Sequence, residues 1–314
     1  MKFSLKTLLG AVGIALGLAT SGASAAETPA ELRIGYQKYG TLVILKERGV
    51  LEERFADRGI KVRWTEFPAG PQMLEALNVG SVDFGTVGET PPVFAQAADA
   101  DLVYVAHQPP APTAEAIIVH KDSPIKTVAD LKGKRVALNK GSNVHFLLVR
   151  ALEDAGLSIR DIRPAYLPPA DARAAFERGS VDAWVIWDPF LAAAEDALEA
   201  RTLRNGTGLV NNHEFYIAAR PLAEKYPHIV KEIVEELQEL DRWAIDNPRE
   251  IAKTLAPSTG LAEDVIYVAA TRANYGARYL SDEVIEQQQT IADTFSDLKL
   301  IPKKLDIPSV VWKP

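Results

Sequence analysis

Residues 67–92, FPAGPQMLEALNVGSVDFGTVGETPP, carry the alternation that decides the fold. Methionine and leucine recur at helical spacing over residues 71–79, and Gly80 ends the helix that this spacing predicts. Residues 82–87 form a short apolar run typical of a buried strand, and the prolines after Thr90 suit the first turn of another helix. A strand enclosed between two helices predicts an α/β architecture with a largely parallel sheet.

The tetrapeptide GSVD at residues 80–83 of this stretch recurs at residues 179–182. Each copy follows a proline-containing turn and a short predicted helix. Each is followed by a strand and then by a helix that opens at proline. Two longer helices, each preceded by a glycine, are predicted to begin near residues 41 and 143. Because these features share one order, the sequence predicts two similar lobes rather than a coincidence of four residues.

The alternation extends outward from both copies. Further strands are predicted at residues 31–36, 61–67, 101–107, 114–120, 134–138, 162–167, 181–186 and 214–219. Further helices are predicted at residues 41–57, 143–155, 170–178 and 189–200. From residue 221 onward the pattern is nearly all helical, and the chain ends in an irregular tail from residue 301.

The first 25 residues are predicted to be a cleavable export signal. Lysines at positions 2 and 6 precede an uncharged apolar stretch at residues 8–19, and Ala23-Ser24-Ala25 provides a small-x-small cleavage site. The apolar stretch is shorter than the about 20 residues that a membrane-spanning helix needs. We expect a mature chain that starts at Ala26 and has no lipid anchor, because no cysteine follows the cleavage site.

Composition excludes several classes of function. The 314 residues include 35 lysines and arginines against 42 aspartates and glutamates, a net charge of −7, and loss of the two signal lysines would make it −9. No nucleic-acid partner is expected for an acidic chain without a basic patch. The absence of cysteine excludes thiol nucleophiles and cysteine-ligated zinc, and the five scattered histidines lack metal-ligand spacing. Because no phosphate-binding loop or dinucleotide fingerprint occurs either, we expect no metal and no cofactor.

The predicted lobes have a chemical consequence. In a parallel α/β lobe the strand-to-helix loops leave at one edge of the sheet, where ligands bind. Each loop presents a helix N-terminus with unpaired N–H groups and partial positive charge. Two such edges facing one another across a cleft form an anion site that needs no lysine or arginine.

Several stretches resemble one family. They include LRIGYQK at residues 32–38, EFPAGPQMLEALNVG at residues 66–80 and VDAWVIWDPF at residues 181–190. They are similar to those of periplasmic aliphatic sulfonate-binding proteins, the substrate-binding subunits of sulfonate ABC importers. The resemblance covers nearly the whole mature chain.

The resemblance implies a two-lobed, type II periplasmic binding protein, in which each lobe is a mainly parallel sheet flanked by helices and the ligand cleft lies between the lobes. Lobe 1 would comprise residues 26–115 and 220–314, lobe 2 residues 116–219, with the hinge near residues 112–115 and 218–221. The implied ligand is a small organic sulfonate anion and the implied partners are the permease subunits of the transporter. We expect a periplasmic monomer that is not an enzyme.

Candidate ligand-binding residues in the first lobe lie at three strand-to-helix turns. Amide and hydroxyl donors to the sulfonate are expected there, although Thr41 equally suits a helix cap and Glu89 is awkward beside an anion. Gly88 would allow a close backbone approach. The candidates are Gln37, Gly40 and Thr41, then Gly70 and Gln72, then Gly88, Glu89 and Thr90.

The second lobe supplies two more turns. Small donor-rich residues before a helix, Gly141, Ser142 and Asn143, suit a tetrahedral anion head. Trp187 would pack on the alkyl part of the ligand, with core packing as the alternative, and Asp188 suits a helix cap as well as a ligand contact.

Two other functions remain open at this point. One is a receptor of the same class for taurine, nitrate or a thiamine precursor. The other is an enzyme on the same fold. The absence of cysteine argues against a thiamine-forming enzyme, and no acid–base pair emerges to support a lyase.

Overall fold

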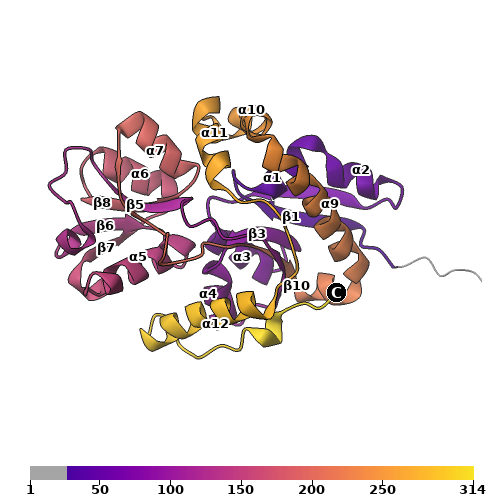
Figure 1. Ribbon diagram of the computed structural model, residues 1–314. Coiled ribbons are helices and arrows are strands. Elements are labelled where there is room, and N and C mark those ends of the chain that lie inside the picture. Colours follow the sequence, from indigo (N-terminus) through magenta and orange to yellow (C-terminus); the bar gives the residue numbers. More distant parts are fainter. Residues whose placement is uncertain (1–26) are drawn as a thin grey trace, which may run out of the picture.

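The computed structural model describes residues 27–314 (Figure 1). The predicted export signal, residues 1–25, lies outside the described residues. The chain forms two five-stranded sheets, each flanked by helices, and Figure 1 shows them in two lobes side by side. In the described part of the chain, no helix combines the length and the apolar character that a membrane crossing requires.

The first sheet has the strand order β2-β1-β3-β10-β4. Strand β1 runs parallel to β2 and β3, whereas β10 lies antiparallel between β3 and β4. Four of the five strands therefore share one direction. The bounds are β1 (Glu31–Tyr36), β2 (Lys61–Glu66), β3 (Phe84–Gly88), β4 (Leu102–His107) and β10 (Glu214–Ala219).

The second sheet repeats this plan in the order β7-β6-β8-β5-β9. Strand β6 is parallel to β7 and β8, and β5 is antiparallel to both β8 and β9. The shared topology confirms the two similar lobes that the repeated GSVD landmarks predict. The bounds are β5 (Glu115–Val119), β6 (Arg135–Leu138), β7 (Arg163–Tyr166), β8 (Ala183–Trp187) and β9 (Arg201–Asn205).

Helices follow the parallel strands as expected. The single helix predicted over residues 41–57 is in fact two, because Gly49 takes a left-handed conformation with φ +65° and ends the first. The first lobe carries α1 (Thr41–Arg48), α2 (Val50–Ala56), α3 (Gly70–Asn78) and α4 (Pro91–Ala97). The second carries α5 (Asn143–Asp154), α6 (Pro169–Glu177) and α7 (Phe190–Leu198).

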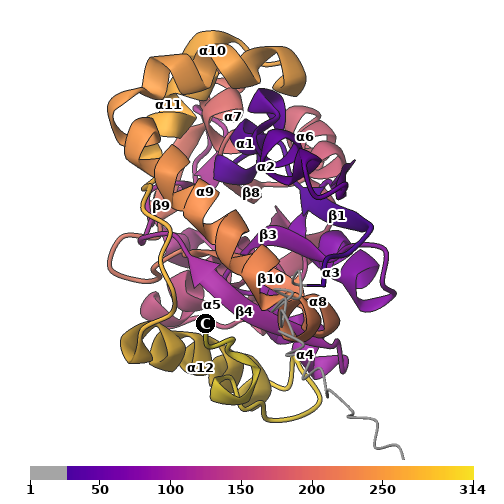
Figure 2. The ribbon, with the colours of Figure 1, turned by 90° about the vertical axis from the view of Figure 1, so that its right-hand side faces the viewer.

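The C-terminal third returns to the first lobe as helices. Figure 2 shows α9, in orange, running along the outside of this lobe, and α9 packs against α1 and α2. The helical pattern predicted from residue 221 onward is divided at Tyr226, just before Pro227. The bounds are α8 (Arg220–Lys225), α9 (Pro227–Asp246), α10 (Pro248–Thr259), α11 (Glu263–Arg272) and α12 (Asp282–Asp297).

The chain crosses between the sheets twice, along residues 108–114 and 206–213. The first crossing lies close to the expected hinge at residues 112–115. The second differs from the expected hinge at 218–221, because β10 belongs to the first sheet. Its residues Phe215 and Ile217 are 1% and 0% exposed, since the strand is enclosed by β3 and β4.

The lobes also touch outside the crossings. On one side α7 packs on α11 through small apolar residues that include Ala193 and Ala269. On another side His145 of the second lobe lies against the rings of Phe94 and Phe295, on α4 and α12 of the first. These contacts fix the distance across which the two sheet edges face each other.

Candidate ligand-binding cleft between the lobes

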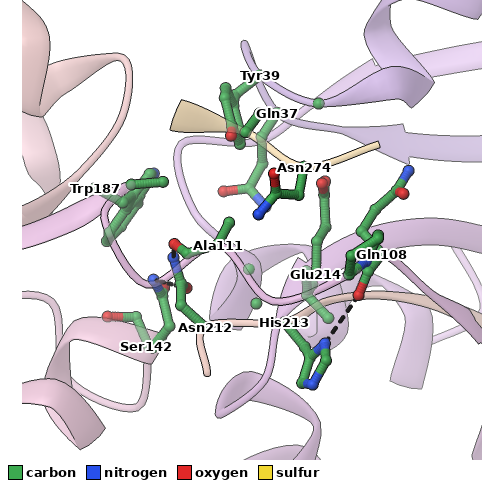
Figure 3. A pocket seen from close by; sticks show the side chains of 18 of the residues that line it. Gln37, Tyr39, Gln108, Ala111, Ser142, Trp187, Asn212, His213, Glu214 and Asn274 are labelled. Atoms are coloured by element: carbon green, nitrogen blue, oxygen red, sulfur yellow. Dashed lines mark hydrogen bonds between the residues drawn. The ribbon is translucent and has the colours of Figure 1, made fainter. Parts of the chain in front are cut away.

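A cavity of about 70 Å³ lies between the lobes, at the carboxyl ends of the parallel strands (Figure 3). Parts of both lobes and of both crossings line it, which is the place where α/β lobes hold ligands. Its polar and aromatic lining comprises Gln37, Tyr39, Gln108, Ser142, Asn143, Trp187, Asn212, His213, Glu214, Asn274 and Tyr275.

Seven of the candidate residues line this cavity. They come from the loops after β1, β2, β3, β6 and β8, so five loops distant in sequence converge as the α/β pattern predicts. The seven are Gln37, Gly40, Gly70, Gly88, Ser142, Asn143 and Trp187. Their contact with a ligand stays a prediction.

Thr41 and Asp188 are placed away from the cavity lining by their own hydrogen bonds. The Thr41 hydroxyl is buried and donates to Asp241 on α9 at 2.7 Å, so it neither caps α1 nor faces the cavity. Asp188 accepts from the backbone N–H of Ala192 at 3.0 Å and lies 3.4 Å from the Arg272 guanidinium. Its bond to the first turn of α7 matches the capping alternative.

The remaining four candidates also lie outside the lining. Glu89 is buried and accepts from the backbone N–H of His213 at 3.0 Å, on the side of the crossing that faces α12. Thr90 is fully buried at the start of α4, and Gln72 lies in the first turn of α3. Gly141 has φ +75° with the Phe94 ring behind it, so this glycine serves the turn.

Gly88 marks a close approach of the lobes. A Cβ at this position would lie 3.0 Å from the side chain of Asn143 in the second lobe. The small size of Gly88 thus makes room for a facing side chain of the other lobe, and its expected approach to a ligand stays a prediction. Asn143 is itself held in place, because its amide donates to Glu115 and, at 3.0 Å, to Asn212 of the second crossing.

The helix N-termini at the cavity differ in the donors they offer. Helix α4 begins with Pro91 and Pro92, which have no N–H group, so its first turn lacks two donors. Helix α5 begins after Ser142, whose hydroxyl donates to the carbonyl of Asn139 at 2.8 Å instead of capping the helix. In this first turn the N–H group of His145 already donates to the carbonyl of Ser142 at 2.9 Å, so the N–H groups of Asn143 and Val144 remain for a bound anion.

Glu214 brings a carboxyl group into the same cavity. It accepts from the Thr86 hydroxyl at 2.8 Å, and burial raises the pKa of Glu214 to about 7. In Figure 3 its side chain extends toward Asn274 and Gln37. None of the described residues that line the cavity is a lysine or arginine, so backbone dipoles and neutral donors provide the anion-attracting groups.

Most residues that sequence reasoning missed lie on the crossings and the C-terminal region. Tyr39 lies between the candidates Gln37 and Gly40, but Gln108 and Asn274 are far from any strand-to-helix turn. Asn212, His213 and Glu214 form a polar run that leads into β10, directly before its apolar residues. That polar run is the signal that could have found them.

The comparisons with known proteins agree on one family. The family model described as NMT1/THI5 like matches residues 53–251. A "Putative aliphatic sulfonates-binding protein" of Escherichia coli (strain K12) is 48% identical over 301 residues, covering 95% of this chain and 94% of that protein. The chain belongs to the aliphatic sulfonate-binding proteins of the NMT1/THI5-like family.

Solved structures of this family match the whole architecture. The alkanesulfonate-binding protein SsuA from Xanthomonas axonopodis pv. citri, bound to MOPS, has a TM-score of 0.88 and 46% identity, covering 92% of this chain and 100% of that one. The periplasmic aliphatic sulphonate binding protein SsuA from Escherichia coli has a TM-score of 0.83 and 49% identity, with coverages of 91% and 93%.

A more distant likeness extends to an enzyme. The desulfurization enzyme DSZB matches with a TM-score of 0.64 at 16% identity, which shows a shared fold alone. The family relatives at high identity are binding proteins.

Proposed function

We propose that this chain is the periplasmic substrate-binding component of an ABC importer, which captures alkanesulfonates in the interlobe cleft and delivers them to the membrane permease. One observation carries the proposal. The uncapped first turn of α5 opens into a cavity whose lining, within residues 27–314, has no lysine or arginine. A small anion fits such a site, because its charge can be met by N–H groups and the helix dipole.

The rest of the cavity suits an organic tail. Trp187 and Tyr39 line it from opposite lobes, and Figure 3 shows the two rings on opposite sides of the space. Aromatic walls bury methylene groups, each contributing about 0.8 kcal/mol when fully removed from water. An alkanesulfonate has the anionic head and apolar tail that these two halves of the lining require.

Capture would proceed by a hinge motion about the two crossings. Ligand touching Ser142 on one lobe and Gln37 on the other would favour the closed form, by its differential affinity for that form. The permease would then recognise the closed protein. The predicted export signal at residues 1–25 would place the mature chain, a monomer without enzymatic activity, in the periplasm.

Calorimetry of the purified protein with a panel of alkanesulfonates, sulfate and nitrate tests this function. We expect ethanesulfonate or a longer alkanesulfonate to bind and to raise the melting temperature by mass action. Binding of sulfate or nitrate with no response to any sulfonate would overturn the ligand class.

A further inference from the structure

The carboxyl group of Glu214 sets one end of the cleft apart from the other. Glu214 begins β10, and its carboxylate lies against Gly40, the residue that caps α1, with Oε1 nearest. A Cβ on Gly40 would overlap Oε1 and lie 3.2 Å from Oε2. The space at the N-terminus of α1, where an anion would otherwise bind, is therefore filled by an acidic group of the protein itself.

This placement orients the ligand. A sulfonate beside Glu214 would meet a like charge whenever that carboxyl is ionised, whereas a sulfonate at α5 meets uncapped N–H groups. Glu115 also lies near α5, but the amide of Asn143 stands between it and the cavity, and Glu115 does not line the cavity. The anionic head therefore belongs at α5 and the other end of the ligand at Glu214.

The surroundings of Glu214 suit a cation. Thr86 donates to Oε1, and the other carboxylate oxygen belongs to a residue that lines the cavity. The rings of Tyr39 and Tyr275 line the same end, and the faces of aromatic rings attract ammonium groups. In Figure 3 the carboxyl end of Glu214 lies beside Asn274 and on the same side of the space as Gln37, and the amides of these two residues add neutral partners.

We propose that the cleft prefers sulfonates that carry an ammonium group at the far end of a short chain, with the sulfonate at the N-terminus of α5 and the ammonium on Glu214. This inference rests on the proposed function, since it names the class of sulfonate that the same site takes. It makes Glu214 a specificity-determining residue of the cleft.

The pH dependence of binding carries the signature of this arrangement. Glu214 is faced by Asp241 from α9, by the hydroxyl of Thr86 from β3, by the phenols of Tyr39 and Tyr275, and by its neighbour His213. Ionisation of Glu214 near pH 7 adds a negative charge to the cavity. Affinity for an ammonium sulfonate should then rise between pH 6 and pH 8, and affinity for a plain alkanesulfonate should fall.

The test is calorimetry with 3-aminopropanesulfonate and butanesulfonate, two ligands of equal length that differ in one terminal ammonium or methyl group. In the wild-type protein at pH 8 we expect the amino compound to bind at least tenfold more tightly. Glu214→Gln, of nearly the same shape, should abolish or reverse that preference and flatten both pH profiles. Glu89→Gln, which neutralises a buried carboxyl outside the cavity, should keep the wild-type ratio.

Three outcomes would overturn the inference. Butanesulfonate that binds as tightly as the amino compound in the wild type, or a preference that survives Glu214→Gln, removes the ammonium site while leaving the proposed function intact. Failure of the folded protein to bind either compound contradicts the proposed function and this inference together.

Discussion

The N-termini of α1 and α5 occupy matching places in the two lobes, yet the chain treats them differently. Both helices follow a glycine turn after the first strand of a parallel unit and begin at the cavity. At α1 a carboxylate from β10 lies on the capping glycine. At α5 the capping serine turns its hydroxyl back to Asn139 and leaves the first turn open. Two equivalent helix starts thus become one acidic end and one anion-binding end of a single cleft.

The difference between the two helix starts comes from the strand that follows each crossing between the lobes. The antiparallel strand of the first sheet, β10, starts with Glu214 at the cavity, and the antiparallel strand of the second, β5, starts with Glu115 behind Asn143. Burial raises the pKa of Glu115 well above its usual range, and this carboxyl does not line the cavity. Similar lobes therefore acquire opposite electrostatic character from one side chain each.

Placing a carboxylate at the N-terminus of α5 should remove the difference between the two helix starts. This change should have the largest effect on sulfonate affinity. In Ser142→Asp the new side chain would cap α5 and compete with the sulfonate for the same N–H groups. We expect affinity to fall at least a hundredfold, about 2.8 kcal/mol. Calorimetry with propanesulfonate measures the loss.

Ser281→Asp is the matched control, because Ser281 already caps α12 by accepting from Val284 and does not line the cavity. It should bind like the wild type. Retention of wild-type affinity by Ser142→Asp would contradict the assignment of the anion to α5.

The Glu214 carboxyl, at the start of α1, should also lower the stability of the folded protein in a pH-dependent way. The pKa of Glu214 is about 7 in the folded protein against an ordinary 4.5, so the folded state holds this proton more tightly than the unfolded state does. The stabilising contribution of the Glu214 carboxyl is fully present below pH 4.5, and it is lost as the pH rises through 7. Glu214→Gln should therefore be more stable than the wild type by about 2 kcal/mol at pH 8, after discounting for contact with the cavity.

Urea denaturation at pH 5, 6, 7 and 8 measures this difference. The advantage of Glu214→Gln should be near zero at pH 5 and level off above pH 7. A constant difference across the series would show that Glu214 is not held neutral by burial.

Removing side-chain donors from the first turn of α5 should reduce sulfonate affinity less than blocking that turn with Ser142→Asp. Ser142→Ala combined with Asn143→Ala leaves the backbone N–H groups in place but removes the amide that positions this turn. We expect affinity for propanesulfonate to fall about tenfold, or about 1.4 kcal/mol.

Thr41→Ala, at the start of α1, is the control variant, because the Thr41 hydroxyl donates to Asp241 and Thr41 does not line the cavity. It should lower the melting temperature and leave affinity unchanged. A folded α5 double variant with unaltered affinity would remove Ser142 and Asn143 from the site.

The smallest effect is expected at the contact between α7 and α11. Arg272 of the first lobe donates to Glu195 of the second at 2.5 Å and lies near Asp188. Arg272→Gln should weaken the closed form and reduce sulfonate affinity about threefold, as for a partly exposed ion pair. Arg220→Gln, which breaks a pair with Asp101 inside the first lobe, should leave affinity unchanged. Equal losses in both variants would exclude a role specific to interlobe contact.

The sequence predicted the two lobes because their landmarks are local. Strand and helix periodicity, glycine stops and proline starts are each readable within about a dozen residues. The partners of β10 were not readable, because a strand such as FYIA that is buried on both faces gives no signal for its neighbours. That ambiguity is why the second hinge was expected after β10 rather than before it.

The site was predicted where it depends on strand-to-helix turns. Gln37, Ser142 and Trp187 lie at such turns and line the cavity. Tyr275 and Asn274 could not be found, since they follow α11 and reach the cavity only through the packing of the C-terminal helices on the first lobe. The role of Glu214 likewise depends on Gly40, a residue far away in the sequence.

The most direct test is a crystal structure of the protein grown with propanesulfonate, with the ligand sulfur located by anomalous scattering. The chain has no cysteine and only two methionines, so few other sulfur atoms compete with that signal. We expect the sulfur beside Ser142 and Asn143, with sulfonate oxygens accepting from the first-turn N–H groups of α5. A sulfur seated at Gly40 and Thr41, with Glu214 displaced from the start of α1, would contradict it.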